Sequence, residues 1–297
     1  MRKVFWLLCL PLLAVAASAQ LGKLKVYISV DMEGVAGVVT ADQLGPASFE
    51  YAKFREFMTR ETLSAVQAAK QAGATEILVA DSHGNMENLL IDMFPPDVRL
   101  IRGSPRRLSM MAGIDRTFDA VIFIGYHAST NNLQGVRAHT FSSARLTRVA
   151  LNGAVVTEGA FNAAVAGHFG VPVVMISGDD AAVAEVRSLV GNIEGFETKK
   201  TLGFHSANSL TPEASIAGIA QKVKAALARR GDFKPYAVKA PVTLDISFKN
   251  YMPAEVLAYL KIVQRVDSHS IRYVGQDMVD VSDFVDFISS YNLALEP

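Results

Sequence analysis

Short apolar runs alternate with amphipathic segments from Leu24 to about Asp180. Runs of β-branched and other apolar residues predict buried strands, whereas apolar positions that recur about every three or four residues predict helices. Strands are expected at residues 25–30, 76–80, 98–101, 120–124 and 171–176. A long helix is expected from Phe49 to Ala72, with Gly73 as its terminator. This order predicts an α/β fold with a mostly parallel sheet flanked by helices.

The second half of the chain has a looser pattern, and we expect a smaller C-terminal α/β domain there. Helices are expected at residues 181–190, 212–230 and 278–291, and further apolar segments lie at 242–248 and 253–260. Pro235, Pro241 and the turn at Gly231-Asp232 mark a less regular passage. The simplest partition is a larger α/β domain over residues 20–190, which contains the candidate site residues, and a smaller one over residues 191–297.

Two segments inside the larger domain alternate polar and apolar residues. They span residues 136–142 and 148–156, and the second contains Asn152-Gly153, a pair typical of tight hairpin turns. We expect an antiparallel insertion there.

Residues 1–19 have the pattern of a secretory signal peptide. Arg2 and Lys3 precede an apolar stretch from Val4 to Ala16, and Ala17-Ser18-Ala19 offers a small-residue cleavage site. The apolar stretch is shorter than the roughly 20 residues that a membrane-spanning helix needs. We therefore expect cleavage after Ala19, a periplasmic or secreted protein, and no stable membrane insertion after cleavage.

Composition narrows the partners and the ligand chemistry. Without Arg2 and Lys3 the chain has 27 basic residues against 29 acidic ones, a net charge of about −2. A nucleic-acid partner is not expected, because no basic stripe is available to neutralise phosphates. The single cysteine, Cys9, lies in the signal segment. Any metal in the mature protein is therefore expected to have oxygen and imidazole ligands.

Two carboxylates follow the first predicted strand, in Val30-Asp31-Met32-Glu33-Gly34. Alternate side chains of a strand point to the same face, so Asp31 and Glu33 are expected to lie side by side at the strand end. On their own they are compatible with a magnesium site, an aspartyl nucleophile or a polar strand terminus.

Two further strands end in residues that can bind a metal. Asp81-Ser82-His83 follows the strand at 76–80, and Gly125-Tyr126-His127 follows the strand at 120–124. Ligands of open α/β sheets bind outside the carboxyl ends of the strands, so these residues converge with Asp31 if the strands are neighbours. A single buried histidine is more often structural than a ligand. The joint placement is what indicates a metal site.

Glu158 and His139 are two more candidates. Glu158 starts a predicted helix, where an acid complements the helix dipole and Thr157 is suited to cap it, but that position also faces the same crevice. His139 lies on an alternating segment, and its ordinary role there is a half-exposed strand histidine. An imidazole beside a metal, but not bound to it, could move protons or stabilise an oxyanion.

These motifs resemble the zinc D-aminopeptidases of the dipeptide-permease-operon type, in the same order and over nearly the whole chain. The matching segments are Ser29-Val30-Asp31-Met32-Glu33-Gly34, Asp81-Ser82-His83, Gly125-Tyr126-His127-Ala128, His139, Glu158-Gly159 with Asn162, and Gly178-Asp179-Asp180. One difference is that the catalytic histidine of the family usually has serine neighbours, whereas His139 lies between Ala138 and Thr140.

The resemblance implies a site with two zinc ions per subunit. Asp31 would bridge them, Glu33 and His83 would complete one site, and His127 and Glu158 the other, with His139 as the catalytic residue. It also implies an aminopeptidase acting on short peptides, with D-alanyl peptides as the expected substrates, and a ring-shaped homo-oligomer. Ligand identity does not fix stereochemistry, so L-residues or amides remain alternatives.

Two other functions fit parts of the pattern. A periplasmic peptide- or solute-binding protein without hydrolytic activity matches the size and the secretion signal, but needs no carboxylates and histidines at three strand ends. An aspartyl-phosphate phosphatase would use Asp31 as nucleophile, but Glu33 would replace a shorter Asp and the histidines would have no role.

Overall fold

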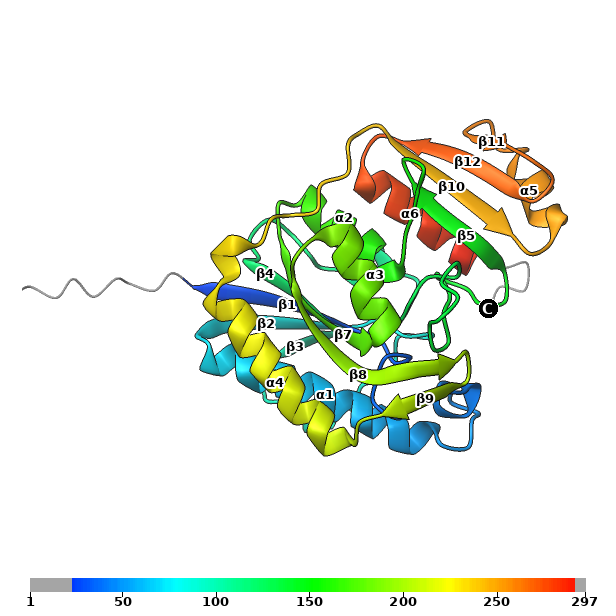
Figure 1. The fold of residues 1–297 in the computed structure, drawn as a ribbon. Coiled ribbons are helices and arrows are strands. Elements are labelled where there is room, and N and C mark those ends of the chain that lie inside the picture. The colour runs from blue at the N-terminus through cyan, green and yellow to red at the C-terminus, as the bar shows by residue number, and fades with distance from the viewer. Residues whose placement is uncertain (1–22, 292–297) are drawn as a thin grey trace, which may run out of the picture.

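The computed structural model describes residues 23–291, which form two β-sheets with helices packed on them (Figure 1). The larger sheet has seven strands in the order β3-β2-β1-β4-β7-β8-β9. Its strands are β1 (Leu24–Val30), β2 (Ala74–Asp81), β3 (Arg99–Ile101), β4 (Ala120–Tyr126), β7 (Val173–Asp179), β8 (Glu194–Gly203) and β9 (Ser206–Ser209). All neighbours pair in parallel except β8 and β9. The predicted fold class, an α/β fold with a mostly parallel sheet, is confirmed.

The strand order reverses between β1 and β4. From β1 the chain proceeds to β2 and then β3 on one side, whereas β4, β7 and β8 extend the sheet on the other side. In open α/β sheets such a reversal leaves a crevice at the carboxyl ends of the two strands, where ligands bind. Asp31 and His127 directly follow these two strands.

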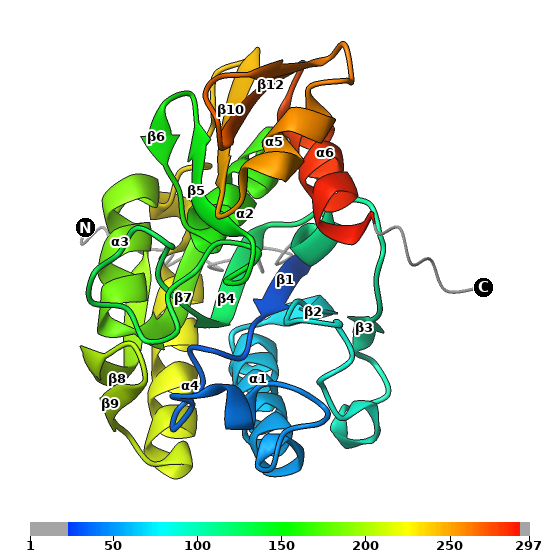
Figure 2. The ribbon, with the colours of Figure 1, turned by 90° about the vertical axis from the view of Figure 1, so that its right-hand side faces the viewer.

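Helices cover both faces of the larger sheet (Figures 1 and 2). On one face α1 (Tyr51–Gln71) packs against α4 (Pro212–Ala228), and on the other lie α2 (Glu158–His168) and α3 (Asp180–Val190). The starts of α2, α3 and α4 are capped by Thr157, Asp179 and Thr211, whose side chains accept a backbone N–H of the first turn. Short 3₁₀ helices span Ala41–Gln43, Ile91–Met93, Ser109–Met111 and Arg230–Asp232.

The smaller sheet is antiparallel and has the order β11-β12-β10-β5-β6. Its strands are β5 (Leu146–Leu151), β6 (Ala154–Val155), β10 (Val242–Phe248), β11 (Val263–Arg265) and β12 (Ser270–Gly275). The helices α5 (Tyr251–Leu257) and α6 (Met278–Ser290) pack on it. The predicted hairpin at Asn152-Gly153 joins β5 to β6, and both turn residues have the positive φ that such a turn requires.

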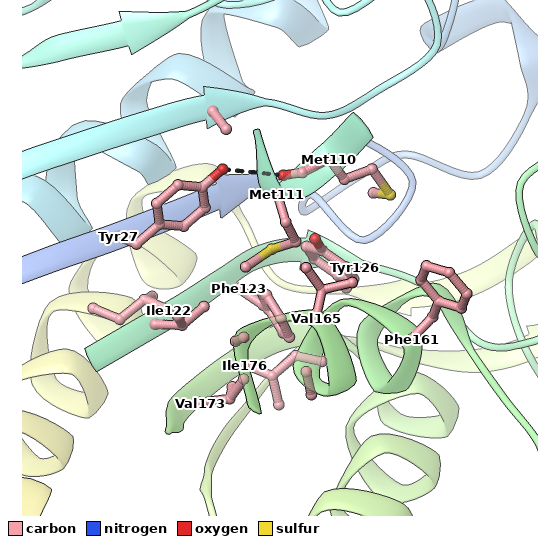
Figure 3. Packing of buried hydrophobic residues seen from close by; sticks show 14 of the residues in the cluster. Tyr27, Met110, Met111, Ile122, Phe123, Tyr126, Phe161, Val165, Val173 and Ile176 are labelled. Atoms are coloured by element: carbon pink, nitrogen blue, oxygen red, sulfur yellow. Dashed lines mark hydrogen bonds between the residues drawn. The ribbon is translucent and has the colours of Figure 1, made fainter. Parts of the chain in front are cut away.

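A continuous hydrophobic core lies between the larger sheet and its helices. Figure 3 shows Phe123 and Ile176 of the sheet together with Val165 of α2. All three are fully buried, and burial of each such side chain contributes about 1.5–3 kcal/mol. The buried Tyr27 hydroxyl donates a hydrogen bond to the carbonyl of Ala112 over 2.8 Å. Within residues 23–291, no helix is long and apolar enough to cross a membrane.

The prediction of an antiparallel strand at residues 136–142 is wrong. The segment is a loop, in which Arg137 and Phe141 have positive φ. Its backbone N–H groups bond to distant partners instead of a neighbouring strand: Val136 donates to the Asp179 carboxylate and Arg137 to the carbonyl of Phe204. Tertiary hydrogen bonds therefore override the alternating pattern.

The division into domains at residue 190 stays a prediction. The larger sheet continues beyond that residue through β8 and β9, and the smaller sheet takes β5 and β6 from before it. The predicted signal peptide at residues 1–19 lies outside the described residues.

Candidate metal centre

Three neighbouring strands bring the predicted ligands together at one edge of the larger sheet. Asp31 and Glu33 follow β1, His83 follows β2 and His127 follows β4. The pairing of β1 with β4 continues into the loops, because the Asp31 N–H donates to Ile124 O over 2.8 Å and the Gly34 N–H to Gly125 O over 2.7 Å. The backbone therefore fixes the loop that carries both carboxylates.

Asp31 lies between two imidazoles. Its Oδ1 is 3.3 Å from His83 Nδ1, and its Oδ2 is 3.3 Å from His127 Nε2. Glu33 is on the His83 side, with Oε2 2.9 Å from His83 Nδ1. Each carboxylate oxygen of Asp31 thus faces a different histidine.

Backbone carbonyls orient the two rings. His83 Nε2 lies 2.8 Å from the carbonyl of Leu44, and His127 Nδ1 lies 3.0 Å from the carbonyl of Ala128. A carbonyl only accepts, so these nitrogens carry hydrogen and the opposite nitrogen of each ring faces the carboxylates. Second hydrogen bonds of this kind fix the orientation of metal-binding histidines.

Glu158 approaches from the start of α2, where Thr157 caps the helix as predicted. Its Oε1 lies 3.5 Å from His127 Nε2 and accepts a 2.6 Å hydrogen bond from the backbone N–H of Phe141. The loop at residues 136–142 thus holds a carboxylate of the cluster.

His139 belongs to the same cluster, although it is on a loop and not on a strand. Its Nδ1 donates to the carbonyl of Arg137 over 2.8 Å. Its Nε2 lies 3.7 Å from Glu158 Oε1 and 4.0 Å from Glu33 Oε1. Nε2 of His139 therefore points at the carboxylates of Glu33 and Glu158, and His139 lines the cavity over them.

The electrostatics of the cluster favour positive charge. Burial raises the pKa of Asp31, and the neighbouring Glu33 raises it further. Burial would also raise the pKa of Glu33, but His83 outweighs this and holds that pKa well below its usual range. Burial alone would lower the pKa of His127, but Glu158 and Asp31 outweigh this and hold that pKa well above its ordinary value. A cation at this position would relieve the repulsion between buried carboxylates.

Two orphaned atoms show that the site fits a metal. Asp31 Oδ2 and His127 Nε2, which lie 3.3 Å apart, are buried, and neither makes a hydrogen bond within residues 23–291. Buried polar atoms are normally satisfied, so their lone pairs need a ligand of another kind. The residues also form two groups whose ligand atoms lie within 4.8 Å of one another, Asp31, Glu33 and His83 in one and His127, His139 and Glu158 in the other. Carboxylate oxygen and imidazole nitrogen are suitable ligands of zinc.

A buried hydrogen-bond network joins the four elements that carry the cluster. Ser29 Oγ of β1 lies 2.8 Å from Ser82 Oγ after β2 and 2.7 Å from the Tyr126 hydroxyl of β4. Asn162 of α2 donates to the same Tyr126 hydroxyl over 3.0 Å. Asn162 therefore bonds to the buried network that joins the elements of the cluster.

Lys199 of β8 holds the loop after β1 that carries Asp31 and Glu33. No sequence motif marks this lysine. It is 1 % exposed, and its Nζ donates to the carbonyls of Glu33, Val35 and Val38. Burial lowers its pKa to about 8. Only the fold reveals this role, because the lysine lies more than 160 residues from the loop that it holds.

Two other acidic residues near the strand ends have structural roles. Asp81 accepts the backbone N–H of Leu89 over 2.7 Å and the side-chain amide of Asn88 over 2.8 Å. Asp179 caps α3 by accepting the Ala182 N–H. Neither is therefore available as a ligand.

A cavity of about 390 Å³ opens over the cluster. Asp31, Glu33, His83, His139 and Glu158 line it, and so do Arg145 and residues at the end of α6. This volume is at the lower end of the range of about 300–1,000 Å³ for small-molecule sites. The α/β fold and this cluster of carboxylates and imidazoles under an open cavity are those of a metal-dependent hydrolase.

Comparisons with known proteins give the family. Residues 24–287 match peptidase family M55, described as D-aminopeptidase. The D-aminopeptidase of Bacillus subtilis (strain 168) is 31 % identical over 258 residues, covering 86 % of this chain and 93 % of that protein. The solved structure of the Zn-dependent D-aminopeptidase DppA from Bacillus subtilis, described as a self-compartmentalizing protease, superposes with a TM-score of 0.86 at 30 % identity, covering 92 % of this chain and all of that one.

The chain belongs to the D-aminopeptidase family M55. The predicted family and enzyme class, a metallo-aminopeptidase-like hydrolase, are therefore confirmed. A solute-binding protein and an aspartyl-phosphate phosphatase are not supported.

Proposed function

We propose that this protein is a di-zinc aminopeptidase that removes the N-terminal residue, a D-residue such as D-alanine, from short peptides. The observation that carries the proposal is the position of Asp31, whose two oxygens each face one histidine at 3.3 Å. A carboxylate in this position is suited to bridge two metal ions. The relatives described as D-aminopeptidases support the reaction and the stereochemistry.

We assign the zinc ligands according to which carboxylate oxygen of Asp31 each residue lies near. Glu33 and His83 would hold one zinc with Asp31 Oδ1, and His127 and Glu158 would hold the other with Oδ2. Zinc in such a site supplies Lewis acidity, which polarises a peptide carbonyl and makes water a better nucleophile near neutral pH. The set contains no thiolate and leaves positions open for water and substrate, as a catalytic site requires.

His139 is the residue that we assign to proton transfer. Its Nδ1–H is held by the carbonyl of Arg137, so Nε2 faces the reaction space. From this position Nε2 can hold a proton and donate it to the amine that leaves when the peptide bond breaks, or stabilise the developing oxyanion.

The test is an assay of the purified mature chain on matched D-alanyl and L-alanyl dipeptides, with and without a chelator. We expect hydrolysis of the D-peptide, loss of activity in chelator and recovery on addition of zinc. A metal-free protein that binds peptides without cleaving them would refute the proposal, and equal rates on both stereoisomers would refute its stereochemical part.

We also propose that the protein acts outside the cytoplasm, on the basis of the sequence at residues 1–19. Peptidoglycan-derived D-alanyl peptides would be available there. N-terminal sequencing of protein from fractionated cells tests this: an intact N-terminus in the cytosolic fraction would contradict the proposed location.

We further propose a ring-shaped homo-oligomer, in agreement with the self-compartmentalizing description of DppA. The smaller sheet and α5 carry an exposed apolar surface, which another subunit would cover. It consists of Tyr251, Met252, Val256, Tyr259, Leu260, Ile262, Val266 and Val274. Tyr259→Glu should reduce the mass measured by light scattering, whereas Lys224→Glu on the exposed side of α4 should not.

A further inference from the structure

Arg145 lies in the loop before β5 and lines the same cavity as the metal cluster. The other charged groups that line it are the cluster itself and Asp286. Among the described residues that line the cavity, Arg145 is therefore the one permanent cation. A permanent cation in the same cavity as such a cluster is suited to bind an anionic part of a substrate.

The fold holds Arg145 in this position. Its backbone carbonyl accepts the Lys249 N–H over 2.8 Å, and its Nη2 donates to the carbonyl of Ser289 at the end of α6 over 3.1 Å. A guanidinium has five N–H donors in a planar fork, so this single bond leaves donors for a ligand.

Asp286 also lines the cavity, but it does not neutralise Arg145, whose side chain bonds to the carbonyl of Ser289 instead. Burial and the neighbouring Asp283 raise the pKa of the Asp286 carboxyl group, an effect that Arg106 and the hydroxyls of Ser109 and Ser290 oppose. Arg106, in turn, donates to the carbonyls of Gly103 and Ser109 over 3.1 and 2.9 Å. Arg106, and not Arg145, is thus the cation that acts on Asp286, so the guanidinium of Arg145 keeps donors for a ligand.

We infer that Arg145 binds the C-terminal carboxylate of a short peptide while the N-terminal residue lies at the metal cluster. This inference rests on the proposed aminopeptidase function and narrows its substrates to very short peptides with a free carboxyl end. The cavity of about 390 Å³ agrees with such a length. The guanidinium matches a carboxylate in bidentate geometry, whereas a C-terminal amide offers it neither the charge nor two acceptor oxygens.

The experiment compares D-alanyl-D-alanine with its C-terminal amide, using the full mature chain loaded with zinc. We expect kcat/KM of the wild type to be higher for the free acid. Arg145→Gln should lower kcat/KM for the acid by about 10- to 100-fold, mainly through KM, as expected for loss of a hydrogen bond to a charged group. The value for the amide should change by less than about threefold, so the preference disappears. Arg145→Lys should recover part of the preference, because it keeps the charge without the fork.

Arg148→Gln is the matched control, since this arginine lies on β5 and does not line the cavity. It should keep the preference for the acid. Equal losses on acid and amide in Arg145→Gln, or equal use of both by the wild type, would overturn the inference and leave the proposed peptidase intact. Cleavage of neither substrate by the wild type would overturn both.

Discussion

The imidazole rings of His127 and His139 lie face to face, with ring centroids 4.0 Å apart and planes inclined by 8°. Each ring donates its Nδ1–H to a backbone carbonyl, so both Nε2 atoms point to the same side. They lie 3.5 and 3.7 Å from the same atom, Glu158 Oε1. His127 is the more buried of the two, and His139 borders the cavity. Two similar rings are therefore suited to different tasks, metal binding and proton transfer.

His139→Ala should lose activity and keep zinc. General acid–base groups contribute about 100- to 10,000-fold to rate, so kcat should fall within that range. Zinc content measured by atomic spectroscopy should match that of the wild type. Loss of zinc together with activity would show that His139 is a ligand.

His83→Ala should lose zinc as well as activity. The change removes a ring whose Nδ1 faces both Asp31 and Glu33. Loss of a residue that only hydrogen-bonds to a metal ligand lowers metal affinity by about 10- to 100-fold, and loss of His83 should lower zinc affinity by more than that. Zinc titration with a competing chelator measures the change. His168→Ala, at the exposed end of α2, is the control and should bind zinc normally.

Lys199→Met should weaken zinc binding without touching a ligand side chain. It leaves the carbonyls of Glu33, Val35 and Val38 without their donor in a buried site, at a cost of about 1–3 kcal/mol for each unsatisfied group. Thermal unfolding and zinc titration should both respond. Lys200→Met, exposed on the same strand, should leave both unchanged, and normal zinc affinity in Lys199→Met would argue against a positioning role.

Glu61 on α1 should make stability depend on pH. It is fully buried, and burial raises its pKa to about 7 from an ordinary value of 4.5. The folded state then holds the proton more tightly than the unfolded state. Its stabilising effect is complete below about pH 4.5 and is lost as pH rises through about 7.

Glu61→Gln removes this titration and keeps an oxygen to accept from Ala36 N–H and the Ser215 hydroxyl. Relative to the wild type, its free energy of unfolding should rise by about 3 kcal/mol between pH 4.5 and 8, measured by urea unfolding. Glu56→Gln, exposed on the same helix, should show no such change. A constant difference between Glu61→Gln and the wild type would contradict the prediction.

Gly34→Ala should disrupt the site by separating the loops after β1 and β4. A Cβ at Gly34 would lie 2.1 Å from Tyr126 O and 2.5 Å from the carbonyl carbon of Gly125, both backbone atoms. We expect destabilisation of at least about 3 kcal/mol and weak zinc binding. Gly203→Ala, where a Cβ meets nothing within 4 Å, is the control. A stable, zinc-loaded Gly34→Ala protein would show that the loops can move apart.

Local patterns were sufficient to predict the strands that lead to Asp31, His83 and His127, because buried parallel strands are continuous apolar runs and polar residues mark their ends. The helix start at Glu158 had an equally local signal in Thr157. The alternating pattern around His139 favours a strand, but the segment is a loop because its conformation depends on bonds to residues such as Asp179 and Phe204. Lys199 and Arg145 gave no signal, since each acts on groups far away along the chain.

The cavity has walls of different origin. The cluster comes from residues 31–158, whereas four other lining residues, Val285, Asp286, Ser289 and Ser290, belong to α6, the last helix of the described residues. Substitutions in α6 can therefore reshape the cavity without disturbing the groups to which we assign the reaction. Selectivity and chemistry are separately evolvable in such an arrangement, and exchange of α6 between family members is a direct way to transfer one without the other.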